Sequence, residues 1–212
     1  MFIFDEVQIF ILGMMLMLLF SLWFLVNRKY SEYFSMAFLV SSITTLTYAL
    51  LLDGRIISLS ASGNPVYFTR WLFYIASCSL LMLTITKVLK VRKENILSVL
   101  VLNGLVMLSG AISAATASPL KWIIFGLGGL FFIAQLILLF DKIPASKRNK
   151  IKKPVCCYIF FGWALFPLIF IFSPEGADII SNFVAATLYL ILDLVTKIIF
   201  YIHLSLLPKS KR

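Results

Sequence analysis

The 212-residue chain is 61% hydrophobic and only 13% charged. A soluble domain is nearer half apolar, so this composition excludes an ordinary soluble fold. The net charge of +10 lies mainly between apolar runs, which argues against nucleic-acid binding, and the three cysteines lie within those runs without the spacing of a disulfide framework or metal site.

Seven apolar runs follow one another along the chain, each close to the roughly 20 residues that a helix needs to cross a membrane. Turn residues and charges separate them, and the stretch 54–64 could form a short hairpin on one surface. We therefore expect an all-α membrane protein with one seven-helix transmembrane domain over residues 1–212. The predicted helices span residues 4–26, 33–53, 67–89, 95–116, 121–141, 154–173 and 178–206.

The 19 lysines and arginines are distributed unevenly between the two sets of loops. The side that contains the C-terminus carries most of them, whereas the opposite side carries only Arg55 and Lys121. Because cytoplasmic loops are enriched in basic residues, this predicts an outside N-terminus, a cytoplasmic C-terminus and insertion into the cell membrane. The residues assigned to the cytoplasmic side are Arg28, Lys29, Lys87, Lys90, Arg92, Lys93, Lys142, Lys147, Arg148, Lys150, Lys152, Lys153, Lys209, Lys211 and Arg212.

Two charges lie deep inside the last predicted helix. Asp193 precedes Lys197 by four residues, so both side chains occupy the same helix face. Ionisable groups in hydrocarbon usually mark function, although a structural ion pair is the simpler interpretation. Desolvation favours the neutral form of an amine, and a neutral amine can form a Schiff base with an aldehyde. The resulting cation needs a nearby anion, which Asp193 can supply.

Other unusual residues lie in the third and sixth runs. Arg70 is either an anchor at the membrane interface or a positive charge beside Asp193. Pro167 bends its helix and frees a carbonyl. Trp163 and Phe166 on the same helix could line a long flat ligand, although ordinary bundle packing explains them equally well.

Together these residues resemble the microbial rhodopsins, and the resemblance covers essentially the whole chain. Asp193-Leu-Val-Thr-Lys197 is similar to the family's Asp-x-x-x-Lys pattern, whose lysine carries retinal. Trp163-x-x-x-Pro167 is similar to the pattern in the family's sixth helix. Further matches in the third and fourth helices are Pro65-x-Tyr67-x-x-Arg70, Asn103-Gly104 and Gly110.

The resemblance implies all-trans retinal bound covalently to Lys197, with Asp193 as the counterion. It implies a protein that is a light-driven transporter and no enzyme, without a metal site. The implied partners are the lipid bilayer, protons and further copies of the chain, with which it would form a trimer. Nucleic acid is not among them. The implied retinal pocket comprises Tyr74, Asn103, Gly110, Trp122, Trp163, Phe166, Pro167 and Phe170.

The third helix distinguishes the subtype. Outward pumps of the family place an acid three residues after the arginine as proton acceptor, and here that residue is Phe73. They place a second acid at the position of Thr84. The neighbouring residues instead resemble the schizorhodopsins, short inward proton pumps with a Phe-Ser-Glu triplet, from which Thr84 departs. The residues of this proton path and Schiff-base environment are Arg70, Phe73, Ser77, Cys78 and Thr84, with Tyr74 as a further match.

This resemblance implies a light-driven inward proton pump. The proton would leave Lys197 toward the cytoplasmic half, where Ser77, Cys78 and Thr84 offer no good acceptor at neutral pH, and would be replaced from outside. His203 is either a relay on the cytoplasmic side or an interfacial packing residue.

Three other functions remain open. The chain could be a photosensor without net ion transport, or, from a different class, a retinal-free transporter or receptor-like bundle. An anion or sodium pump is less expected, because the usual residues of those classes are missing from the matching places.

Overall fold

The computed structural model describes residues 5–53, 58–59, 63–140 and 152–207. Within these ranges, seven helices are long and apolar enough to cross a membrane, and the predicted all-α seven-helix membrane bundle is confirmed. The predicted helix ends at 4 and 141 and most of the hairpin stretch lie outside the described residues. So do the basic residues Arg55, Lys142, Lys147, Arg148, Lys150, Lys209, Lys211 and Arg212.

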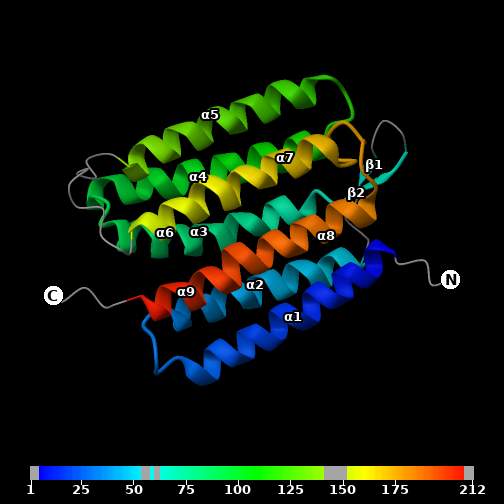
Figure 1. Cartoon of the computed structure of the whole chain (residues 1–212). Helices are drawn as coiled ribbons and strands as arrows, with labels where there is room; N and C mark the ends of the chain where they lie inside the picture. Colours follow the sequence, from blue (N-terminus) through cyan, green and yellow to red (C-terminus); the bar gives the residue numbers. More distant parts are fainter. Residues whose placement is uncertain (1–4, 54–57, 60–62, 141–151, 208–212) are drawn as a thin grey trace.

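Five of the crossing segments are single α-helices, and the last two each contain a short π-helical section (Figure 1). The single helices are α1 (Glu6–Asn27), α2 (Phe34–Asp53), α3 (Thr69–Leu89), α4 (Lys93–Ala115) and α5 (Leu120–Phe140). The sixth segment comprises α6 (Lys152–Cys157), η2 (Tyr158–Trp163) and α7 (Ala164–Phe172). The seventh comprises α8 (Asn182–Asp193), η3 (Leu194–Ile199) and α9 (Phe200–Leu206).

The helices run alongside one another, with α1 and α5 at opposite edges of the bundle in Figure 1. The third and seventh segments are the most enclosed, each with 56% of its most apolar stretch buried, whereas α5 has only 11%. Every backbone group in lipid must be paired within its own segment, which is why such uniformly apolar stretches are helical. The two enclosed segments therefore position the buried polar side chains.

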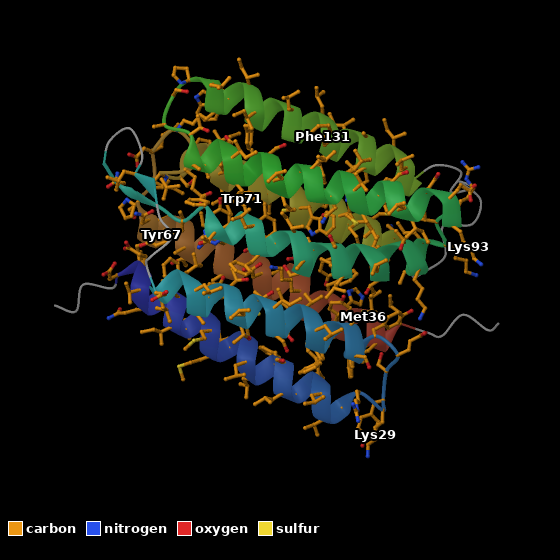
Figure 2. All side chains as sticks on the ribbon, turned by 180° about the vertical axis from the view of Figure 1, so that it is seen from behind. Lys29, Met36, Tyr67, Trp71, Lys93 and Phe131 are labelled. Carbon is orange, nitrogen blue, oxygen red and sulfur yellow. The ribbon has the colours of Figure 1, made fainter. Side chains whose placement is uncertain are left out.

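The two ends of the bundle differ in structure and charge. At one end, which we call the hairpin end, β1 (Ser58–Leu59) pairs antiparallel with β2 (Pro65–Val66), so the hairpin extends beyond the predicted 54–64. The chain's N-terminus also lies there (Figure 1). At the other end, which we call the basic end, Lys29 and Lys93 lie far from Tyr67 of the hairpin end (Figure 2).

The π-helical sections η2 and η3 pack against each other in the middle of the bundle. They approach closely at Gly162, where an added Cβ would lie 2.8 Å from Thr196 Cγ2. Pro167 cannot donate a backbone hydrogen bond, which favours an irregular turn just before it. Single π turns inside α-helices are frequent at functional sites, and η3 contains Lys197.

Candidate functional site

Lys197 and Asp193 form an ion pair inside the bundle. Lys197 Nζ lies 2.7 Å from Asp193 Oδ1, and the two side chains are 1% and 0% exposed. The angles of this contact are outside those of a hydrogen bond. Burying an ion pair is expensive unless further polar groups compensate it. The surroundings of Asp193 supply that compensation.

Two tyrosines donate to the second oxygen of Asp193. Tyr48 Oη lies 2.9 Å and Tyr74 Oη 2.7 Å from Asp193 Oδ2. The ring of Tyr74 also lies 3.7 Å from Lys197 Nζ, measured to the ring centroid. Asp193 therefore faces the amine with one oxygen and accepts two hydroxyl hydrogens with the other. Hydrogen bonds of this kind favour the charged form of a carboxylate.

Arg70 pairs with a carboxylate that neither sequence expectation included. It is 3% exposed, so it does not anchor at the interface, and its ion pair is with Glu175, at 3.8 Å between Nη1 and Oε1. Its guanidinium also lies 4.2 Å from the ring centroid of Tyr189. The loop after α7 folds back into the bundle and brings a carboxylate to Arg70 that hydropathy assigns to a surface turn.

Glu175 is the centre of a buried polar cluster at the hairpin end. Its Oε2 accepts hydrogen bonds from Trp71 Nε1 at 2.9 Å and Tyr189 Oη at 3.0 Å. Burial raises the pKa of Glu175 above its ordinary value, and the Arg70 guanidinium and the two hydrogen bonds offset part of the rise. Lys121, expected in a surface loop, is buried as well, and its Nζ donates to the Gly176 carbonyl at 2.6 Å.

A cavity with nearly uniform apolar walls reaches from Lys197 toward α4 and α5. Of the residues that sequence placed in a retinal pocket, Tyr74, Asn103, Gly110, Trp163, Phe166 and Pro167 line it, and so do Cys78 and Lys197. Sequence reasoning missed several other lining residues, among them Trp71, Met107, Phe125, Gly128, Gly129, Phe132, Gln135 and Thr196. Trp71 is a lining residue and lies toward the hairpin end of the bundle, on the side of Tyr67 (Figure 2).

Two expected pocket residues lie outside the cavity lining. Trp122 is 40% exposed on the outer face of α5 and meets Phe125 edge-on. Phe170 is fully buried and stacks on Phe125 at 4.7 Å between ring centroids, so it supports a lining residue from behind. An evenly apolar helix does not reveal from sequence which face points inward, and this is why Trp122 was misplaced.

The cavity walls fit a long apolar aldehyde. Gly110 has no side chain where a Cβ would lie 2.7 Å from Trp71 Cε3, so Trp71 packs flat on α4. Trp163 and Phe166 add further aromatic surface. The amine of Lys197 lies in the same cavity beside the carboxylate of Asp193. An apolar slot, a buried amine and an adjacent anion are the features that a retinal Schiff base requires.

The remaining predicted path residues lie outside the cavity. Phe73 is half-buried, and Ser77 is buried and donates to the Phe73 carbonyl at 3.5 Å. Thr84 Oγ1 lies 3.0 Å from Tyr201 Oη, toward the basic end. His203 Nδ1 lies 3.3 Å from Tyr158 Oη on the neighbouring segment.

Comparisons with known proteins agree with this geometry. The family of bacteriorhodopsin-like proteins matches residues 6–207. The crystal structure of schizorhodopsin 4 superposes with a TM-score of 0.88 at 31% identity, covering 96% of this chain and 100% of that one.

Two curated relatives have lower identity. Archaerhodopsin-2 of Halobacterium sp. (strain aus-2) is 21% identical over 83% of this chain and 72% of its own length. Sensory rhodopsin-2 of Haloarcula vallismortis is 22% identical over 75% and 70%. The chain therefore belongs to the bacteriorhodopsin-like family of microbial rhodopsins, close to the schizorhodopsins, and is a multi-pass membrane protein.

Proposed function

We propose that the protein is a light-driven inward proton pump in which Lys197 carries all-trans retinal as a protonated Schiff base. The whole chain acts as one retinal-binding domain, with the basic end in the cytoplasm and the hairpin end outside. Basic residues at the described basic end support this orientation, Lys29 and Lys93 among them (Figure 2). By resemblance to the schizorhodopsins, the protein forms a trimer.

Retinal, when bound, supplies light absorption and a change of shape that turns the N–H of Lys197 away from Asp193. Asp193 then serves as counterion and is a poor proton acceptor, because Tyr48 and Tyr74 already donate to it and stabilise its negative form. Phe73 offers no acceptor where outward pumps of the family have an acid. The proton on Lys197 therefore leaves toward the basic end.

The observation that carries this proposal is the pair of hydrogen bonds that Asp193 accepts on the oxygen facing away from Lys197. Within the described residues, Asp193 is the carboxylate that contacts Lys197, and its other oxygen holds two hydrogen bonds. The second buried carboxylate, Glu175, is engaged with Trp71 and Tyr189 at the hairpin end. The two tyrosine hydrogen bonds support the proposal that Asp193 stays an anion and does not carry the proton outward.

The test is the sign of the light-induced pH change in an unbuffered suspension of cells that express the protein with all-trans retinal. Inward pumping makes the medium more alkaline, and a protonophore abolishes the change. Acidification of the medium would overturn the proposal. Lys197→Ala is the control, because it removes the attachment point and with it both the visible band and the pH change.

A photosensor without net transport is the alternative, which the name of the Haloarcula relative, a sensory rhodopsin, supports. It predicts a visible band and a light reaction without any steady pH change or photocurrent. The same suspension experiment therefore separates the two functions.

A further inference from the structure

We propose that the proton released from Lys197 leaves the protein through Thr196, a small cavity and the Tyr158–His203 pair, with His203 as the last protein group on the path. This inference rests on the proposed function. In this proposal the sixth and seventh segments release the proton to the cytoplasm, which a carboxylate at position 84 assists in the resembled pumps.

The path begins beside the amine. Thr196, the neighbour of Lys197 in η3, lines both the main cavity and a second, smaller cavity of about 10 Å³. Trp163 of η2 also lines both. The small cavity therefore shares the wall that Thr196 and Trp163 form, and apolar side chains of α3, η2 and α9 complete its lining. Its size is about that of one water molecule.

The path continues to Tyr158, which lines the same small cavity at the start of η2. Tyr158 Oη lies 3.3 Å from His203 Nδ1, and its ring meets Phe200 edge-on at 5.3 Å between centroids. Both Tyr158 and His203 are half-buried, so the pair lies between the small cavity and the basic end of the bundle. Imidazole is the side chain that changes protonation most readily between pH 5 and 8.

A rival route along α3 ends inside the protein. Thr84 Oγ1 and Tyr201 Oη are 3.0 Å apart, but Thr84 is 4% exposed and Tyr201 is 0% exposed. Phe24 and Phe200 pack on the ring of Tyr201. Neither hydroxyl holds an extra proton at neutral pH. This pair therefore bridges α3 and α9 and offers no group that could pass a proton to solvent.

The transfer conserves protons. The N–H bond at Lys197 Nζ breaks and its proton passes to a water in the small cavity. The Tyr158 hydroxyl accepts one proton at its oxygen and gives its own to His203 Nδ1, which becomes an imidazolium. The imidazolium then loses a proton to cytoplasmic water, and Lys197 Nζ is reprotonated from the outer side.

The kinetic test follows the appearance of protons at the basic end after a flash, using a pH-sensitive dye and protein oriented in liposomes. His203→Gln and Tyr158→Phe slow this release by about tenfold or more, since a positioned proton-transfer group contributes at least that much. The matched control Tyr201→Phe removes the rival hydrogen bond and leaves the release rate within about twofold of the unaltered protein. Added imidazole restores the rate of His203→Gln.

A second readout is independent of pumping. His203 is the single histidine of the chain, so ¹⁵N-histidine labelling gives one pair of ring signals. In the protein without retinal or light, Tyr158→Phe moves the Nδ1 signal, whereas Tyr201→Phe does not. An unmoved signal contradicts the Tyr158–His203 contact, and this variant also covers the case in which His203→Gln fails to fold.

Failure of the inference and failure of the proposed function are distinct. Inward pumping with unaltered release in both His203→Gln and Tyr158→Phe overturns the exit path and leaves the proposed function standing. Outward pumping, or none, overturns the proposed function and with it the exit path, whatever the histidine signal shows.

Discussion

The hydroxyl of Tyr74 donates a hydrogen bond of 2.7 Å to the oxygen of Asp193 that does not face Lys197. The ring of the same tyrosine lies 3.7 Å from Lys197 Nζ. Tyr74 thus contacts both members of the buried ion pair, the anion through its polar tip and the cation through its π face. The pair is held as a unit, and changes to either member affect the other.

Replacing Asp193 by Asn removes the anion and leaves a buried cation without a partner, which typically costs about 3–5 kcal/mol. We expect the retinal-loaded variant to lose most of its visible absorption at neutral pH in favour of a near-ultraviolet band, because Lys197 Nζ gives up its proton. Absorption spectroscopy checks this. Asp178→Asn is the control, since Asp178 lies in the loop at the hairpin end and bonds Asn64. A full visible band in Asp193→Asn contradicts the counterion role.

We expect a methyl group added at Gly13 to displace Tyr48 from Asp193. A Cβ at Gly13 would lie 2.7 Å from the Tyr48 ring, whereas nothing lies within 4 Å of a Cβ at Gly126. Overpacking of this kind costs about 1–3 kcal/mol, while alanine in place of an unhindered helical glycine contributes about 0.5–1 kcal/mol of stability. Unfolding in mixed micelles compares Gly13→Ala with Gly126→Ala. Equal stabilities of the two variants refute the close contact.

Glu175 makes stability depend on pH. Its folded-state pKa is above the ordinary value of 4.5, so its stabilising contribution is complete below that pH and is lost as pH rises through the folded pKa. The Gln side chain of Glu175→Gln cannot ionise. The thermal midpoint of this variant, relative to the unaltered protein, therefore improves as pH increases from 4.5 to the folded-state pKa of Glu175. Glu94→Gln is the control for removal of a carboxylate from an exposed site. A constant difference between Glu175→Gln and the unaltered protein at all pH values contradicts the raised pKa.

We expect Trp71 and Trp122 to differ in their effect on colour. Trp71 lines the cavity, whereas Trp122 is 40% exposed and does not. We therefore expect Trp71→Leu to move the absorption maximum to shorter wavelength, because a polarisable wall is lost, and Trp122→Leu to leave it unchanged. Spectra of both variants with retinal decide the matter. A shift of similar size in both would place Trp122 against the chromophore.

The helices and the central pair were predictable because their signals are local. Long apolar stretches have few alternatives in lipid, and the spacing of Asp193 and Lys197 fixes them on one helix face. Tyr48 was missed because its partner is 145 residues away. A systematic search for the partner of each polar side chain inside a span would have drawn attention to it.

Glu175 could not be found in this way, because a tight turn determines its position. The backbone N–H groups of Ile179 and Ile180 both donate to the Phe172 carbonyl, and Asp178 has a left-handed φ of 58°. A Cβ at Gly176 would collide with the Phe170 carbonyl. Hydropathy reads the segment as an ordinary surface loop, whereas this geometry turns it inward.

The low burial of α5 suggests how binding of retinal would affect the stability of this helix. This helix has the smallest buried share of the described spans, 11%, yet Phe125, Gly128, Gly129 and Phe132 from it form one wall of the cavity. One part of its inward surface packs on α4, and another part lines the space that the chromophore would fill. Bound retinal would therefore complete the packing of α5 against the rest of the bundle. We expect protein without retinal to exchange its α5 amide hydrogens faster, and to be cleaved faster by proteases, than protein with retinal.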